Sequence, residues 1–219
     1  MNATILYCWA LMPVAAYLLG SVPFGLLLCR AIKGVDIRES GSKNIGATNA
    51  GRVCGKPFFF AAFALDFLKG LAPVLVGGLV LEQFGSGLAV APMMILYGAS
   101  AVAGHTFPVY LRFKGGKAVA TSFGVLVGLA PAAAAIAFGV WLVFLLALRY
   151  MSVASMLGAI AAPAAYAGLH WGRLGETEHW SVLAFTAVVA ALVVVRHRAN
   201  IKRLIAGTES RVTFTKKAD

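Results

Sequence analysis

The sequence alternates long apolar runs with short polar segments, and this alternation restricts the possible folds more than any other feature. A helix needs about 20 apolar residues to cross a bilayer. Runs of roughly that length cover residues 4–28, 57–81, 88–106, 152–170 and 179–196. Of the 219 residues, 60% are hydrophobic and only 12% are charged, so a soluble domain of this size has too little interior to bury them. The sequence therefore predicts an all-α integral membrane protein.

A longer apolar run covers residues 118–148 and is interrupted by the sequence Gly-Leu-Ala-Pro at 128–131. Its 31 residues are too many for one span, and proline is tolerated in the first turn of a helix. We predict two short helices joined by a tight turn, which brings the total to seven transmembrane helices. Residues 1–219 then form one polytopic membrane domain that ends in a short polar tail from about residue 210.

The cations lie almost entirely on one side of this predicted arrangement. Seven spans place 17 of the 19 lysines and arginines on one face, whereas the opposite face receives Arg173 and three glutamates. The remaining cation, Lys69, lies inside the second span three residues after Asp66, so that the two side chains can pair. By the positive-inside rule, the N-terminus is outside and the C-terminus is cytoplasmic.

The composition also limits the partners. Orientation in the membrane and anionic lipid headgroups or substrates explain the net charge of +11. The cations lie between apolar runs and lack the interleaved exposed aromatics of nucleic-acid-binding surfaces, so we expect no nucleic-acid partner. Cys8, Cys29 and Cys54 are scattered, without the spacing of a metal site. The cysteines therefore support neither a disulfide framework nor a zinc site.

Three polar segments fall on the same predicted face of the membrane. They cover residues 40–52, 104–121 and 196–209. Each places glycine-rich backbone beside cations or amide side chains, and this is the chemistry that binds a phosphate group. The pattern predicts a site for a phosphorylated, partly apolar substrate.

The first segment contains five candidate phosphate ligands. Its glycines allow a close approach of the backbone to a ligand. Side-chain donors are offered by Ser42, Asn44, Thr48 and Asn49, and Arg52 offers a planar fork of donors. A polar turn whose serine and asparagine cap helices explains the same residues equally well.

In the second segment, Lys114 and Lys117 flank two glycines where the next helix is expected to begin. Free N–H groups at the start of a helix attract phosphate. His105 precedes this loop at the membrane boundary and can carry a proton or donate to a phosphate. The alternative is that both lysines only set the orientation in the membrane, and we favour phosphate binding.

The third segment places His197, Asn200 and Arg203 three residues apart, hence on one face of a helix, with Glu209 beyond them. A basic helix beside the membrane is most often an anchor to lipid headgroups. That function does not explain Asn200 and Glu209, and a glutamate there is suited to fixing a histidine or lysine. Ser152 lies on the same predicted face and by itself indicates a helix cap.

The chain resembles the bacterial acyl-phosphate:glycerol-3-phosphate acyltransferases, the PlsY family, over nearly its whole length. The resemblance lies in GSKNIGATNAGR, GHTFPVYLRFKGGKAVAT and RHRANIKRLIAGTE, and in the shorter segments LDFLKG and RYMSVAS. It implies an inner-membrane enzyme with a cytoplasm-facing site. The resemblance also implies that the enzyme uses neither acyl-CoA nor a metal, so we expect no cofactor. Such an enzyme moves an acyl chain from acyl phosphate to the sn-1 hydroxyl of glycerol 3-phosphate, which yields lysophosphatidic acid. Its partners would be both substrates, membrane lipids and a soluble enzyme that supplies the acyl phosphate.

By the same resemblance, the site residues fall into two groups. The catalytic group is Ser42, Ser152, His197, Asn200 and Glu209, and the phosphate-binding group is Asn44, Arg52, His105, Lys114 and Lys117, to which Arg203 is added from its helix face. Two positions depart from the family pattern. Lys43 and Ala118 both stand where the family usually has glycine.

We expect a direct attack of the hydroxyl on the acyl phosphate, without an acyl-enzyme. His197, hydrogen-bonded to Glu209, is the expected protein base, although a substrate phosphate is an alternative proton acceptor. Ser42 and Asn200 would position the hydroxyl or the oxyanion. Two other classes of function stay open at this stage: a small transporter of a phosphorylated solute, which the intramembrane Asp66 and Lys69 favour, and a structural membrane subunit.

Overall fold

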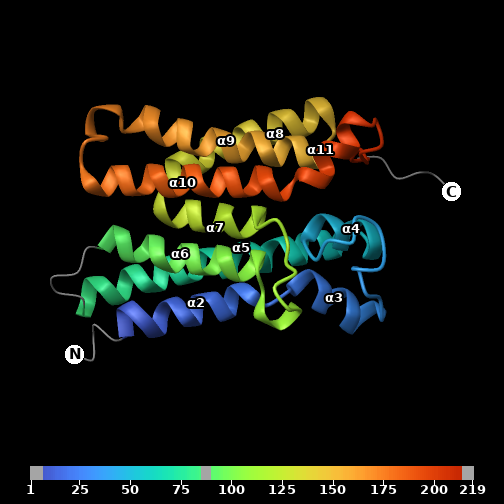
Figure 1. The fold of residues 1–219 in the computed structure, drawn as a ribbon, viewed down its shortest axis with the longest axis horizontal. Helices are drawn as coiled ribbons and strands as arrows, with labels where there is room; N and C mark the ends of the chain where they lie inside the picture. Colours follow the sequence, from blue (N-terminus) through green and yellow to red (C-terminus); the bar gives the residue numbers. More distant parts are fainter. Residues whose placement is uncertain (1–6, 85–89, 214–219) are drawn as a thin grey trace.

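The protein is a bundle of helices. A computed structural model describes residues 7–84 and 90–213, and every regular element in these residues is a helix, which confirms the all-α part of the predicted fold class. Figure 1 shows the main helices side by side along the long axis of the molecule. In chain order they are η1 (Tyr7–Leu11), α2 (Met12–Ser21), α3 (Phe24–Lys33), α4 (Ala47–Cys54), α5 (Lys56–Phe84), α6 (Val90–Thr106), η2 (Val109–Leu111), α7 (Val119–Leu129), α8 (Pro131–Leu148), α9 (Met151–Leu169), η3 (Trp171–Arg173), α10 (Thr177–Arg196) and α11 (Arg198–Ile205).

Five of these helices are long and apolar enough to cross a membrane: α5, α6, α8, α9 and α10. Each covers one of the apolar runs in the sequence. Their outward faces carry large apolar side chains such as Leu79 and Val188, which are 66% and 67% exposed. Lipid tails, rather than water, are the environment in which such faces are stable.

The first predicted span, 4–28, is bent. Helices α2 and α3 meet at an angle of 42° around Val22 and Pro23. Proline has no N–H group and interrupts the hydrogen bonds of a helix. Lys69 Nζ donates a hydrogen bond of 2.7 Å to the Val22 carbonyl oxygen at this break. Residues 4–6 lie outside the described residues, and α3 continues past the predicted end to Lys33.

The run 118–148 is divided into two helices, as predicted, with Ala130 alone between them. Helix α7 has only 11 residues. At ~1.5 Å per residue it covers about half of a ~30 Å hydrocarbon core. By length, the described residues supply up to six spans when the bent pair counts as one. The number seven stays a prediction.

Glycines bring α7 close to α5. A Cβ atom on Gly124 would collide with the Phe67 carbonyl oxygen, and one on Gly70 would collide with that of Thr121. The two backbones can approach this closely only because both positions lack a side chain. This packing fixes the start of α7, and therefore the loop before it, against α5.

The polar segments gather at one end of the bundle. Figure 1 shows α3, α4, α11 and the turn between α8 and α9 at the same end, while α2 begins at the other. The predicted polar tail from about residue 210 begins as a packed segment, since Val212 N donates to Arg149 O at 2.7 Å. Residues 214–219 lie outside the described residues.

Candidate active site

The three polar segments meet around one cavity at this end of the bundle. Its lining includes residues from every segment, and Ser152 from α9 also belongs to it. The predicted site residues that line it are Ser42, Asn44, Arg52, His105, Lys117, Ser152, His197, Asn200 and Glu209. The first turn of α4 also lines the cavity, and N–H groups at the start of a helix attract anions. The structure therefore brings together nine of the eleven residues predicted for the site.

A buried asparagine shapes the first segment. Asn49 is 1% exposed, and its Oδ1 accepts a hydrogen bond of 2.8 Å from the Ser42 N–H. Its Nδ2 donates to the carbonyl oxygens of Ile37 and Asn44 at 2.7 and 2.9 Å. Asn44 Oδ1 in turn accepts from Gly46 N at 3.0 Å, so the turn-forming role considered for Asn44 is present. The sequence suggested Asn49 as a donor to phosphate, whereas in the structure its amide group holds the loop and makes it a positioning residue.

An arginine from another helix holds the second segment. Arg196, the last residue of α10, donates from Nε to Gly116 O at 3.0 Å and from Nη2 to Gly115 O at 2.8 Å. The Gly116 N–H donates to His105 O at 3.0 Å. This loop presents Lys117, whose Nζ donates to Asn200 Oδ1 at 2.5 Å. In the sequence, Arg196 looked like one more cation that sets topology, so its role was missed.

Glu209 joins three neighbours, but His197 is not one of its hydrogen-bond partners. Its Oε1 accepts from Ser152 Oγ at 2.8 Å and from Asn200 Nδ2 at 2.6 Å. Its Oε2 accepts from Arg203 Nε at 2.7 Å. The predicted hydrogen bond between His197 and Glu209 is therefore wrong, because the carboxylate is already engaged by a hydroxyl, an amide and a guanidinium group.

Three placements differ from those expected. Lys114 is exposed and lies outside the cavity lining, whereas Lys117 belongs to it. Arg203 also lies outside the lining and holds Glu209 instead. The hydroxyl of Ser152 bonds Glu209 rather than capping α9, which begins without a side-chain cap.

His197 is held as a neutral imidazole. Burial is the main cause that lowers its pKa to about 4, and the charge of Lys117 adds to it. Nδ1 lies 2.7 Å from the Val193 carbonyl oxygen, which only accepts hydrogen bonds. Nδ1 therefore carries the hydrogen, and Nε2 is left with a lone pair that can accept a proton.

The surroundings of Lys117 disfavour its charged form and so lower its pKa. Burial is the main cause that lowers its pKa to about 8, and nearby guanidinium groups add to this against the opposing carboxylate of Glu209. The ammonium form still predominates at pH 7. A phosphate in the cavity would supply the negative charge that this cluster of cations lacks.

A buried ion pair lies beside the cavity. Lys69 and Asp66 are each 2% exposed, and Lys69 Nζ lies 2.8 Å from Asp66 Oδ1. His105 Nδ1 lies 3.7 Å from the same oxygen, and the His105 ring packs against Gly116. The predicted pairing of Asp66 with Lys69 is confirmed. His105 lines the cavity, as expected, but its ring lies between this pair and the glycine loop.

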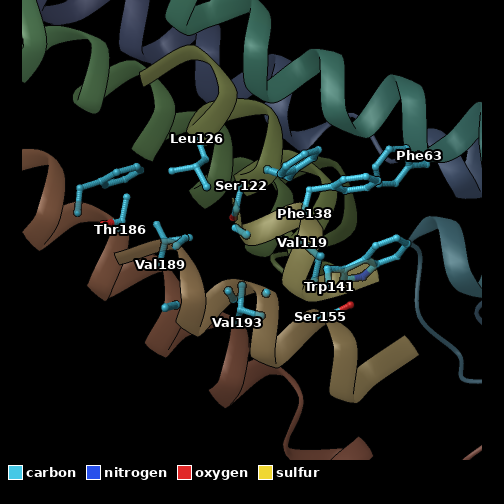
Figure 2. Close-up of a pocket in the computed structure, with 17 residues that line it drawn as sticks. Phe63, Val119, Ser122, Leu126, Phe138, Trp141, Ser155, Thr186, Val189 and Val193 are labelled. Atoms are coloured by element: carbon cyan, nitrogen blue, oxygen red, sulfur yellow. The ribbon is translucent and has the colours of Figure 1, made fainter. Parts of the chain in front are cut away.

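An apolar cavity adjoins the polar one. Figure 2 shows the side chains of α5, α7, α8, α9 and α10 that surround it. The two cavities share the lining residues Phe63, Val119, Trp141 and Ser155. A helical membrane protein in which a cation-lined cavity lies next to an apolar one is suited to bind an amphiphilic anion.

Comparison with known proteins agrees with a helical membrane protein that binds an amphiphilic anion. A family model described as glycerol-3-phosphate acyltransferase matches residues 10–207. A glycerol-3-phosphate acyltransferase of Desulforudis audaxviator (strain MP104C) is 44% identical over 92% of this chain and 94% of its own. One of Brucella suis biovar 1 (strain 1330) is 40% identical over 91% and 90%. The chain therefore belongs to the glycerol-3-phosphate acyltransferase family.

Solved structures show the same fold. The crystal structure of PlsY, an integral membrane glycerol 3-phosphate acyltransferase, in its glycerol 3-phosphate form has a TM-score of 0.79 and 39% identity. The comparison covers 93% of this chain and 94% of that one. The lysophosphatidic acid form of PlsY has a TM-score of 0.78 and 38% identity over the same shares.

Proposed function

We propose that this protein transfers a fatty acyl group from acyl phosphate to the sn-1 hydroxyl of glycerol 3-phosphate and so makes lysophosphatidic acid. One observation carries the proposal: the cation-lined cavity and the apolar cavity are neighbours with four lining residues in common. One molecule can therefore place a phosphate in the first cavity and a hydrocarbon chain in the second. Family membership and the two substrate-related forms of PlsY support it.

The cations and the helix start in the polar cavity would hold the phosphate groups. Arg52 offers a fork of donors, Lys117 offers an ammonium group, and the first turn of α4 offers backbone N–H groups. Ser42 and Asn200 would orient the hydroxyl or the developing oxyanion. Asn49, Arg196 and Glu209 would act through these residues, as positioning groups.

The acyl phosphate is already activated, so the reaction needs alignment and charge stabilisation more than a strong base. The sn-1 hydroxyl oxygen attacks the acyl carbonyl carbon and forms the new ester bond. The bond between that carbon and the phosphate oxygen breaks, and inorganic phosphate leaves with the bonding electrons. The hydroxyl proton goes to Nε2 of His197, which carries a free lone pair in this tautomer, or to a phosphate oxygen.

We further propose seven passes through a bacterial inner membrane, with the N-terminus outside and the site on the cytoplasmic side. The start of α2 and the end of α11 lie at opposite ends of the bundle (Figure 1), and the cations concentrate at the α11 end. Single cysteines at exposed Gly175 and Lys202, in a variant without the native cysteines, test the orientation. An impermeant thiol reagent applied to intact cells should label position 175 and not position 202, and the reverse would refute it.

The activity is tested with purified protein in detergent. Labelled glycerol 3-phosphate and hexadecanoyl phosphate should give lysophosphatidic acid and phosphate without any vesicle or gradient. Acyl-CoA offered in place of the acyl phosphate should give no product. A folded protein that forms no product, but moves glycerol 3-phosphate across vesicle membranes, would instead be the transporter considered from the sequence.

A further inference from the structure

The apolar cavity has a defined entrance. It begins at Phe63, Val119, Trp141 and Ser155, the residues that it shares with the polar cavity. In Figure 2, Phe63, Trp141 and Ser155 lie on one side of the cavity, away from Leu126 and Thr186. If the polar cavity holds the phosphate of an acyl donor, the chain enters the apolar cavity here.

The cavity also has a defined far end. Three helices each contribute one lining residue at the far end and another lining residue nearer the entrance, seven positions away in the sequence. These pairs are Leu126 and Val119 on α7, Ala162 and Ser155 on α9, and Thr186 and Val193 on α10. Seven residues of helix rise about 10 Å, so all three helices place this end at a similar depth.

Buried core closes this end. Leu126 and Ala162 belong to the same buried cluster as Tyr166 and Val182, and Thr186 is 5% exposed. The Thr186 hydroxyl donates to the carbonyl oxygens of its own helix, to Val182 O at 3.0 Å and Leu183 O at 2.9 Å. Its polar group is therefore satisfied within α10, and threonine here does not make the end hydrophilic.

We propose that Leu126, Ala162 and Thr186 form the floor that sets the longest acyl chain the protein uses efficiently. This assignment rests on the proposed function and deepens it. A chain that fits reaches the floor without disturbing the core. A longer chain has to displace buried side chains that are already close-packed, and such overpacking is unfavourable.

Ala162 is the most informative position because its side chain is small and a larger one would raise the floor. Ala162→Leu adds three carbons at the far end and leaves the polar cavity untouched. The matched control is Ala164→Leu, which makes the same change on the same helix at an exposed position. Leu126→Ala makes the opposite change and deepens the cavity.

The test measures kcat/KM of the purified variants with dodecanoyl, hexadecanoyl and octadecanoyl phosphate. A misfit of one methylene in an apolar pocket changes kcat/KM about 10- to 200-fold. Ala162→Leu should therefore lower the hexadecanoyl-to-dodecanoyl ratio at least about tenfold, while Ala164→Leu leaves this ratio at the wild-type value. Leu126→Ala should raise the octadecanoyl-to-hexadecanoyl ratio.

The outcomes separate the two proposals. Unchanged ratios in folded Ala162→Leu and Leu126→Ala, or an equal loss with all three donors, would overturn the role of the floor. If Ala162→Leu does not fold, the ratio in Leu126→Ala decides alone. Wild-type protein that makes no lysophosphatidic acid from any of the donors would instead overturn the proposed function on which the floor depends.

Discussion

At the scale of single residues, Lys117 links the electrostatics of the cavity to a measurable pH dependence. Its pKa of about 8, lowered chiefly by burial, means that the ammonium form is present below that pH and is lost above it. We predict that kcat/KM falls as the pH rises above about 8, because the free enzyme loses a cation that attracts phosphate. A rate profile from pH 6 to 10 measures this.

Lys117→Arg provides the matched comparison. Arginine keeps its charge throughout this pH range, so the alkaline loss of activity should move upward or disappear even if the overall rate is lower. If kcat/KM falls at the same alkaline pH in the wild-type protein and in Lys117→Arg, another group, not Lys117, titrates there.

His197 is the second residue with a sharp prediction. Its neutral ring, with hydrogen on Nδ1, offers Nε2 as a proton acceptor. If that atom takes the hydroxyl proton, His197→Ala lowers kcat about 100- to 10,000-fold. His170→Ala also removes an imidazole ring, at the residue that follows the end of α9 and lies outside the lining of the polar cavity, and serves as the control. A loss in His197→Ala of less than about tenfold would leave a substrate phosphate as the proton acceptor.

Lys43, which by the resemblance in the sequence stands where the family usually has glycine, has a left-handed backbone. Its φ is 57°, and Ala118, the other departure, has the same value. Glycine adopts this region without the strain that a Cβ atom causes. Lys43→Gly should therefore raise the free energy of unfolding by about 1 kcal/mol or less in a denaturation experiment in detergent. Lys43→Ala keeps the Cβ atom and should give no gain, so equal gains in both variants would refute the backbone explanation.

At the scale of elements, the loop before α7 depends on contacts from two other helices. Arg196 on α10 holds its carbonyl groups, and His105 on α6 packs against Gly116. A Cβ atom on Gly116 would collide with the buried His105 ring. Because Lys117 is the next residue, we predict that Gly116→Ala misplaces it and lowers kcat/KM about 100-fold.

Gly172→Ala is the control for that experiment. A Cβ atom there would meet nothing within 4 Å, and the residue lies at the opposite end of the bundle. Its kcat/KM should stay near the wild-type value. Equal losses in both variants would mean that the loop is not the element that positions the lysine.

The elements also show how far the sequence alone could predict the molecule. Apolar runs of spanning length predicted α5, α6, α9 and α10, and the Gly-Leu-Ala-Pro sequence predicted the break between α7 and α8. Local patterns were sufficient because membrane spans must satisfy their own backbone and bury little against other helices. The bend at Pro23 was missed, since a single proline inside an apolar run does not by itself distinguish a kink from a straight span.

The site was harder to predict, for a related reason. Residue types predicted that the three segments meet, but the partners of Glu209 and Arg196 depend on how α9, α10 and the glycine loop pack in space. Lys114 and Lys117 looked equivalent in the sequence. The conformation of the loop, with positive φ at Arg112 and Phe113, leaves the first lysine in solvent and brings the second into the cavity.

At the scale of the whole molecule, the site combines a polar environment with an apolar one. Cations and amide groups gather at one end of the bundle, and an apolar cavity extends from them between the helices. This arrangement allows one ligand to be bound in both cavities at once, with its charged head in the polar cavity and its hydrocarbon chain in the apolar cavity. The proposed activity requires that phosphate binds in the polar cavity.

The most direct measurement is an experimental structure of the protein with glycerol 3-phosphate bound. We predict that the phosphate lies in the polar cavity, with its oxygens about 3 Å from the donor groups of Arg52 and Lys117, and with the sn-1 hydroxyl directed toward His197. A phosphate bound at the opposite end of the bundle, or in contact with neither Arg52 nor Lys117, would contradict the account.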